Sequence, residues 1–233
     1  MRTFVSQDIY PGEFAFHRQY TTVELLLDLV WTHSVIVSEI VIQLLDTQAF
    51  DQTQINRPVA IQSALLHDVG TYFCGGFEWM PGSLPSDKPY AQHTVIGAQV
   101  LEQAGCHPEV VAAARVHAGV GLTSDDISRF GLALPPGEYV PTTPTQQLVT
   151  YASKFHSKTP KFRTGDEVAE SLQKYGDDKV ATFVQLQSQF GSPNLESIQA
   201  KYAEWHRAYQ YVVTSISQPT INLNPAGISQ MRN

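Results

Sequence analysis

Apolar residues fill several stretches of the chain at helical spacing, and polar residues interrupt these stretches at irregular intervals. The longest stretch, residues 21–46, is dense in Leu, Val and Ile. Its β-branched residues favour a strand weakly, but its length favours a buried helix more strongly, since strands seldom exceed about ten residues. Asp28, His33, Ser34, Glu39 and Gln43 interrupt the apolar run. We therefore do not expect it to span a membrane.

The same pattern predicts further helices over residues 59–69, 91–104, 108–117 and 145–157, followed by 166–175, 177–190 and 195–216. Prolines stand where two of these helices begin, and glycines stand where two end. A short helix is expected after Ser124, which can cap it. The pattern predicts an all-α bundle of about five core helices, with C-terminal helices packed on it. The core domain would span 21–190, after an N-terminal extension at 1–20 and before a C-terminal helix and tail at 191–233.

Residues 70–90 break the helical pattern with four glycines and three prolines among aromatic side chains such as Phe73, Phe77 and Trp79. A long aromatic loop of this kind predicts a lid over a site. The polar tail at 218–233 is expected to be loosely ordered.

The composition excludes several classes of function. A net charge of −7 argues against bulk attraction to nucleic acids, although a few local cations could still hold a small phosphorylated substrate. The two cysteines, Cys74 and Cys106, are too few for a disulfide framework, and the N-terminus lacks the pattern of a signal peptide. We expect a reduced, cytoplasmic protein that contacts no membrane. The sequence does not indicate an oligomeric state.

Four histidines fall in or at the ends of the predicted buried helices: His33, His67, His93 and His117. Asp68 follows His67 directly. A buried carboxylate costs several kcal/mol unless a cation neutralises it. Any one of these histidines alone is more often an ordinary core or surface residue. The ordered set is more informative, because each ligand pair is separated by about one helix and a connection, so successive helices could present ligands to one centre. Imidazole and carboxylate suit iron, manganese or zinc.

The ordered set resembles the HD superfamily of metal-dependent phosphohydrolases. The likeness rests on His33, on His-Asp-Val-Gly at 67–70, on Gln-His-Thr-Val-Ile-Gly-Ala around His93 and on Arg-Val-His-Ala-Gly around His117. It covers roughly residues 20–190. It implies an HD-domain helical bundle that holds one or two divalent transition metal ions (Fe, Mn or Zn class) through His33, His67, Asp68, His93 and His117. The implied substrate is a small phosphate ester, such as a nucleotide phosphomonoester or phosphodiester.

In the chemistry that the resemblance implies, the metal lowers the pKa of a bound water, which then attacks phosphorus. Asp68 would be the catalytic carboxylate that bridges or binds the metal. Three cationic residues are candidates for binding the phosphate: Arg115, Lys154 and Lys158.

The chain departs from the family in one place. The last core helix of the family carries a metal-binding Asp, where this chain has Ser153 in Ala152-Ser153-Lys154. A neutral hydroxyl is a poor ligand, so one of the two metal positions is weakened. His156 would lie one turn further on the same helix face and could compensate in part. Two other functions stay open: a di-iron oxygenase of the HD type, and a degenerate HD domain that binds a nucleotide or partner without turnover.

Overall fold

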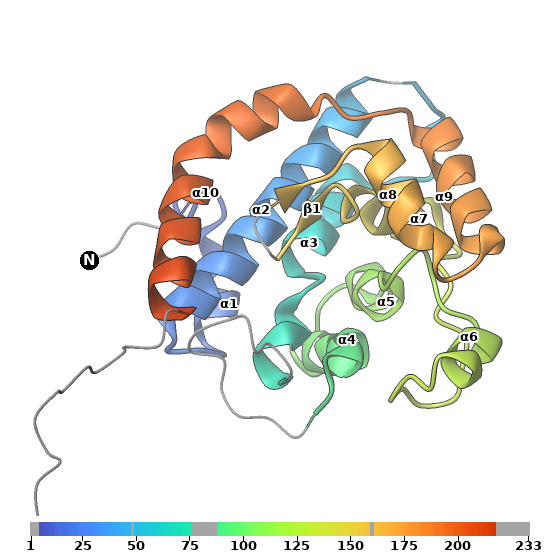
Figure 1. The fold of residues 1–233 in the computed structure, drawn as a ribbon, viewed down its shortest axis with the longest axis horizontal. Coiled ribbons are helices and arrows are strands. Elements are labelled where there is room, and N and C mark those ends of the chain that lie inside the picture. The colour runs from blue at the N-terminus through green and yellow to red at the C-terminus, as the bar shows by residue number, and fades with distance from the viewer. Residues whose placement is uncertain (1–4, 48, 76–87, 159–160, 218–233) are drawn as a thin grey trace, which may run out of the picture.

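The computed structural model describes residues 5–47, 49–75, 88–158 and 161–217. Within these ranges the chain forms ten α-helices, two 3-10 helices and one two-stranded antiparallel sheet (Figure 1). The helices are α1 (Pro11–Arg18), α2 (Glu24–Asp46), α3 (Arg57–Leu66), α4 (His93–Gln103), α5 (Pro108–Val116), α6 (Ser124–Arg129), α7 (Pro144–Ala152), α8 (Gly165–Gln173), α9 (Asp177–Phe190) and α10 (Leu195–Ser217). The shorter elements are η1 (Val69–Phe73), η2 (Tyr90–Gln92), β1 (His156–Ser157) and β2 (Lys161–Phe162). The predicted all-α class is confirmed.

Helix α2 runs through the middle of the core, and residues 26–38 are buried without a break. It packs against α3, α7 and α1. By length and composition α2 could cross a membrane, but 83% of its most apolar window is buried inside the fold. Burial on all sides explains why its apolar residues are not confined to one stripe.

Helices α3 and α7 pack against α2, and α5 packs against both of them, which brings the other predicted site helices together. Asn56 caps α3 by accepting a hydrogen bond from Val59 N, and Thr143 caps α7 in the same way from Gln146 N. Helix α4 packs on η1 through a close approach at Gly70. A Cβ atom added to Gly70 would lie 1.9 Å from His93 O and 2.5 Å from Gly97 N. Only glycine fits there, and its contact holds the start of α4 beside Asp68.

Two sequence predictions about the end of the core are wrong. The helix predicted over 145–157 ends at Ala152, and residues 156–157 form β1, which pairs with β2. Backbone bonds from Lys154 N to Tyr151 O and from Phe155 N to Ala152 O tighten the last turn and end the helix. Packing overrides the helical pattern, since Phe155 is buried against Tyr151 and Phe183. His156 is therefore not one helical turn beyond Ser153.

The segment predicted as an N-terminal extension also holds a helix, α1. His17 of α1 is fully buried, where its ring nitrogens lie 2.7 Å from Tyr72 Oη and 2.8 Å from Leu65 O. The aromatic residues Phe77 and Trp79 of the predicted lid, and the tail at 218–233, lie outside the described residues.

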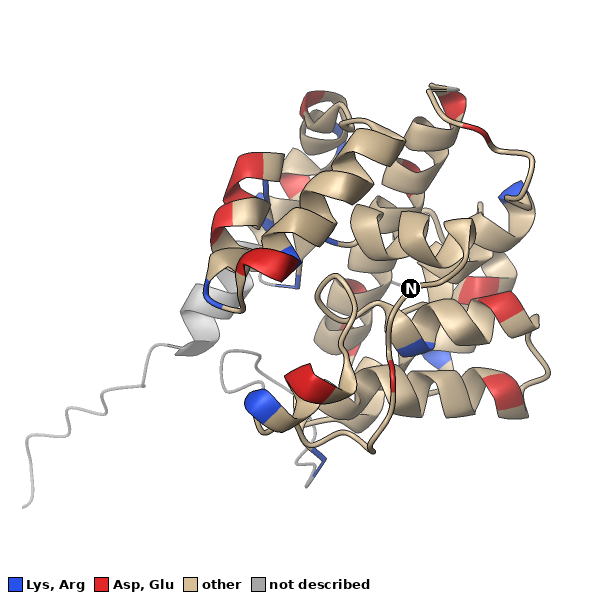
Figure 2. Ribbon diagram, turned by 90° about the vertical axis from the view of Figure 1, so that its right-hand side faces the viewer, with Lys and Arg blue, Asp and Glu red and all other residues tan. Residues whose placement is uncertain are grey.

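Helices α8 to α10 follow the core, as predicted. Helix α10 lies along α2 (Figure 1), where Lys201 and Tyr202 both contact Glu39 and Trp205 donates a hydrogen bond from Nε1 to Asp28 Oδ1 over 3.1 Å. The domain boundaries near residues 20 and 190 stay predictions, but α1 and α10 both pack against α2. Figure 2 shows lysines and arginines scattered among the helices rather than gathered along one of them.

Candidate metal centre

The structure brings the five predicted ligands together around the Asp68 carboxylate. They form two groups of three that share Asp68: His33, His67 and Asp68, and Asp68, His93 and His117. Within each group the ligand atoms lie within 4.8 Å of one another. Asp68 itself is fully buried.

The two oxygens of Asp68 face different histidines. Oδ1 lies 3.5 Å from His93 Nε2 and 3.3 Å from His117 Nε2. Oδ2 lies 3.2 Å from His33 Nε2 and 3.4 Å from His67 Nε2. We call these the Oδ1 half and the Oδ2 half of the centre. Ligand atoms held roughly 2.0–2.2 Å from a metal at near-tetrahedral angles would lie roughly 3.3–3.6 Å apart. Both halves have spacings close to this range.

Helix ends fix the orientation of three of the histidines. His67 and His117 follow the last residues of α3 and α5, and each donates a hydrogen bond from Nδ1 to a carbonyl three residues back, Ala64 O at 2.7 Å and Ala114 O at 2.8 Å. His93 opens α4 and donates in the same way to Tyr90 O at 2.7 Å. A carbonyl oxygen only accepts, so the proton of each neutral ring is on Nδ1 and the lone pair of Nε2 faces Asp68.

This arrangement fits a cation. His93 Nε2 and His117 Nε2 lie 3.0 Å apart with both lone pairs beside the negative Oδ1. The buried His67 Nε2 has no hydrogen-bond partner among the described residues. Converging lone pairs beside a buried carboxylate are unfavourable unless a positive charge lies among them. A divalent metal of the imidazole- and carboxylate-binding class satisfies these donors.

Burial sets the protonation states of the centre. It lowers the pKa of His33 to about 4 and that of His93 to about 3, so these rings are neutral near pH 7, the form that binds metal. Burial alone would raise the pKa of Asp68. The Lys158 ammonium and His67 outweigh it, and the pKa of Asp68 lies well below its ordinary value.

Lys158 lies inside the Oδ2 half. Its Nζ atom is 2.5 Å from Asp68 Oδ2 and 5.3 Å from the centre of the Tyr90 ring, which stacks on His93. Burial would lower the pKa of Lys158, but the Asp68 carboxylate raises it above its ordinary value. The ammonium therefore stays charged and occupies one side of the shared carboxylate.

The centre opens into a cavity of about 530 Å³. The cavity has a polar inner end, where Ser153, Lys154, Lys158 and Arg163 join the ligands. Its outer end is mostly apolar and is lined by Leu122, Phe130, Leu132, Leu172 and Tyr175, together with Lys179, whose ammonium is paired with Asp126. Phe130 and Tyr175 pack edge to face with their ring centres 5.5 Å apart.

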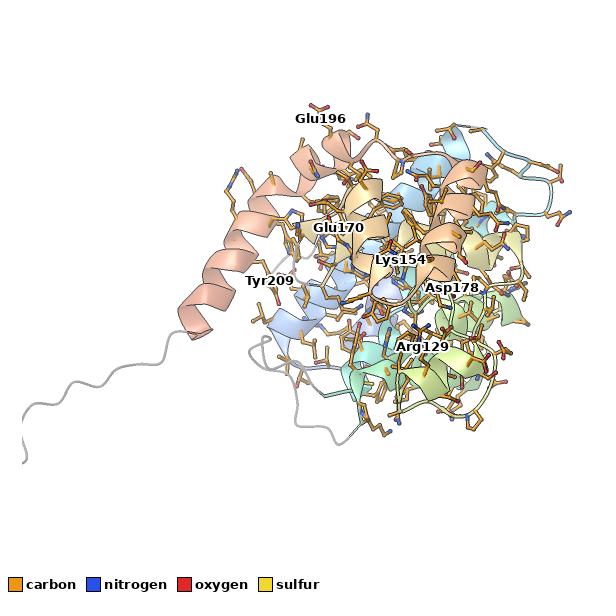
Figure 3. The ribbon with its side chains drawn as sticks, turned by 45° about the vertical axis from the view of Figure 1, so that its right-hand side comes forward. Arg129, Lys154, Glu170, Asp178, Glu196 and Tyr209 are labelled. Atoms are coloured by element: carbon orange, nitrogen blue, oxygen red, sulfur yellow. The ribbon has the colours of Figure 1, made fainter. Side chains whose placement is uncertain are left out.

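Two of the three predicted phosphate-binding residues line this cavity, and the third does not. Lys154 and Lys158 line the cavity, and Figure 3 shows Lys154 near the middle of the molecule. Lys154 Nζ donates to His117 O at 2.9 Å, and its pKa is lowered to about 7 by burial and then by the charges of Arg163 and Lys158. Arg115 is half-buried on α5 and is not among the described residues that line the cavity. Its proposed contact with phosphate stays a prediction.

Ser153 and His156 line the same cavity, but neither contacts Asp68 in the way the four histidine ligands do. Ser153 follows α7 and donates a hydrogen bond from Oγ to Thr150 O at 2.8 Å. His156 is buried, with only 1% of its surface exposed. Its Nδ1 lies 2.9 Å from His33 Nδ1, on the side of the His33 ring that faces away from Asp68.

Sequence reasoning did not assign a role to three residues that the structure places near the centre. Tyr90 stacks on His93 with the ring planes 4° apart. Arg163 lines the cavity, and its Nε atom has no hydrogen-bond partner among the described residues. His206 reaches His156 from α10. Proximity to Lys158 in the sequence was a signal for Arg163, but His206 lies fifty residues from its partner and no local pattern marks it.

Comparison with known proteins gave distant relatives. No protein-family model matches the chain. The chain is 28% identical over 118 residues to the tRNA (cytidine(56)-2'-O)-methyltransferase of Thermoplasma volcanium, a match that covers 51% of this chain and 30% of that protein. It is 27% identical over 112 residues to an uncharacterized protein of Methanocaldococcus jannaschii, covering 48% of this chain and 57% of that protein. The chain thus spans between about a third and somewhat over half of these curated relatives. The methyltransferase name describes the whole longer protein.

Among solved structures, the chain is similar to the HD domain of the L. monocytogenes phosphodiesterase PgpH. The TM-score is 0.45 at 12% identity, and the match covers 89% of this chain and 99% of that domain. The same domain in complex with cyclic-di-AMP gives a TM-score of 0.44. Values at this level establish neither a shared fold nor a shared activity.

Proposed function

We propose that this chain is a metal-dependent phosphohydrolase that acts on a small phosphate ester, with a nucleotide as the preferred candidate. One observation carries the proposal. Two three-ligand groups share the buried Asp68, and they open into a cavity whose inner end holds three cationic side chains, Lys154, Lys158 and Arg163.

One or two divalent ions of the Fe, Mn or Zn class would be held by His33, His67, Asp68, His93 and His117. When bound, such ions supply a water of lowered pKa and neutralise charge on phosphoryl oxygens. The chain's own contribution is to hold the rings in the metal-binding tautomer. Asp68 joins the two halves and, where it is not occupied by metal, can accept a hydrogen bond from the attacking water.

The cationic residues favour a phosphate group at the inner end. Arg163 has a buried Nε atom with no hydrogen-bond partner among the described residues, and Lys154 Nζ donates to the backbone carbonyl of His117. These groups would bind the phosphoryl oxygens and stabilise the charge that develops on them. The apolar outer end fits a flat ring, since Phe130 and Tyr175 present aromatic surface there. A phosphate joined to a base or another aromatic group matches both ends.

Lys158 affects how many ions bind. Its ammonium lies beside Oδ2, which a metal in the Oδ2 half would also need. Two positive charges compete for that oxygen, whereas Oδ1 has no such competitor among the described residues. The Oδ1 half would therefore bind the first ion, and the Oδ2 half would bind a second one more weakly.

The test is a metal analysis of the purified chain, followed by a screen of phosphomonoesters and phosphodiesters with added manganese, iron or zinc. His67→Ala and Asp68→Ala should both abolish turnover. His107→Asn is the matched control, because His107 is exposed and its acceptor role at the start of α5 is retained by asparagine. Hydrolysis that survives both substitutions or full chelation would show that the chemistry lies elsewhere.

The same preparation separates the two alternatives. A di-iron oxygenase would contain iron and consume oxygen with an organic substrate. A degenerate domain would bind nucleotide with no metal-dependent turnover. The cations at the inner end favour the hydrolase over the oxygenase, since Lys154 and Arg163 form no salt bridge among the described residues and a phosphate group would supply one.

A further inference from the structure

His33 differs from the other three histidines in its place in the fold. It lies in the middle of α2, where backbone carbonyls are engaged in the helical hydrogen bonds. The other three rings find carbonyls at helix ends, at Ala64, Tyr90 and Ala114. His33 needs a partner from elsewhere to fix its ring. The structure supplies His156, whose Nδ1 lies 2.9 Å from His33 Nδ1.

A second histidine extends this series of ring contacts. His156 Nε2 lies 3.1 Å from His206 Nε2 of α10. The ring of Phe162 packs against both, with its centre 4.9 Å from that of His156 and 5.1 Å from that of His206. The neighbouring Trp205 anchors α10 to α2 through its bond to Asp28. The three rings of His33, His156 and His206 thus form a connected row that runs from the centre to the C-terminal helix.

We propose that His156 and His206 are positioning residues that select the metal-binding tautomer of His33. This inference rests on the metal centre of the proposed function, but not on the hydrolytic reaction. A neutral imidazole carries one N–H and one lone pair. If the lone pair of His33 Nε2 faces the metal, His33 Nδ1–H donates to His156 Nδ1. His156 Nε2–H must then donate to His206 Nε2, and the remaining proton of His206 is on Nδ1.

The row therefore gives His33 the support that a backbone carbonyl gives the other ligands. Outer partners of this kind commonly change metal affinity by about 10–100-fold. The row of histidines also makes α10 part of the site, because the last hydrogen-bond acceptor of the row, His206, belongs to that helix. Disrupting the row should therefore lower metal affinity only in the Oδ2 half, since His93 and His117 have their own carbonyl partners.

Side-chain shape provides matched substitutions. The amide oxygen of asparagine can take the place of His156 Nδ1, and that of glutamine can take the place of His206 Nε2. We expect His156→Leu to weaken zinc binding at the Oδ2 half by roughly 10–100-fold. His156→Asn should recover most of this loss. His206→Leu should have a smaller effect of the same kind, and His206→Gln should bind zinc like the wild type. His17→Leu is the control, since it removes another fully buried histidine that bonds outside the centre.

Zinc titration of the stripped full-length chain, with and without His117→Ala to weaken the Oδ1 half, measures each affinity. Nitrogen-15 spectra of the zinc-loaded wild type report the ring tautomers directly and should show Nδ1–H on His33 and Nε2–H on His156. Opposite tautomers would overturn the proposal. So would unchanged zinc binding in His156→Leu, or an equal loss in His17→Leu. Failure of the hydrolase proposal looks different, because the wild type would then bind zinc with these tautomers and hydrolyse no ester.

Discussion

The two halves of the centre share one carboxylate but are supported in different ways. In the Oδ1 half, His93 and His117 each bond to a carbonyl only three residues away, and the nearest ammonium, that of Lys158, contacts the other oxygen, Oδ2. In the Oδ2 half, His33 depends on His156, which lies 123 residues away, and Lys158 already contacts the shared carboxylate. Local support makes a ligand robust, whereas distant support ties it to the rest of the fold.

This difference has a consequence for metal binding. The Oδ1 half needs only η1, α4 and α5 to be in place, and α4 packs directly on the other two. The Oδ2 half needs the end of α3, which carries His67, together with α2, the β1–β2 sheet and α10. The Oδ2 half is therefore the one that mutations far from the centre can change.

The largest expected effect is the loss of both halves at once. Asp68→Asn keeps the shape of the side chain but removes the charge that both groups share. We predict that neither half retains metal and that hydrolysis falls to background. Metal content after dialysis and turnover measured together check this. Retention of one bound ion would show that the halves do not depend on a common carboxylate.

The next largest effect is expected from removing Lys158, the cation that makes the Oδ2 half different from the Oδ1 half. In the metal-free protein, Lys158→Met leaves Asp68 buried without its ammonium partner, which typically costs about 3–5 kcal/mol. At roughly 2–4 °C per kcal/mol, the Tm of the metal-free protein should fall by about 6–20 °C. Added zinc should reverse this loss, because the Oδ2 half can then take a metal without competition.

Lys154→Met is the matched control for this experiment. Lys154 bonds to the His117 carbonyl rather than to Asp68, so its removal should leave zinc binding at the Oδ2 half unchanged. Thermal unfolding with and without zinc measures both variants. An equal response to zinc in the two would contradict the competition between Lys158 and the metal.

A third prediction acts on the Oδ1 half alone. Gly70→Ala places a methyl group against the backbone of α4, and overpacking of this kind costs about 1–3 kcal/mol. Helix α4 must move, and His93 moves with it, so the Oδ1 half should lose zinc affinity while the Oδ2 half keeps it. Gly12→Ala in α1 is the control, since a Cβ there meets nothing within 4 Å. Urea unfolding and zinc titration measure the two effects.

The smallest expected effect comes from adding the carboxylate that the resemblance to the HD superfamily implies at position 153. Ser153 lies on the cavity wall, and Ser153→Asp would add a negative charge there. If the residue faces the metal, zinc affinity at the Oδ2 half should rise by about tenfold, equal to about 1.4 kcal/mol. Titration after stripping, with a count of bound ions, compares the variant with the wild type. Equal stoichiometry and equal affinity would show that Ser153 does not face the ion.

Much of the fold could be read from the sequence because apolar periodicity is a local signal. The bounds of α9 were predicted correctly, and those of α4, α5 and α10 were within about two residues. The ordered histidines were found because each lies at a helix and the motifs around them are short. The early end of α7 was missed because Phe155 and His156 leave the helix to make tertiary contacts. His206 was also missed because of a tertiary contact, since folding alone brings its partner His156 close to it.

Helix α2 also bears on how the chain is made. Its apolar faces are covered in part by α7, which begins roughly a hundred residues later in the sequence. At about 5–20 residues per second, a growing chain carries α2 incompletely covered for about 5–20 s. During that interval the helix has the length and composition of a membrane-crossing segment. Asp28, His33 and Ser34 are among the polar residues that lower its hydropathy during that interval. The candidate metal ligand His33 therefore also makes the newly synthesised helix less apolar, and so less similar in composition to a membrane-crossing segment.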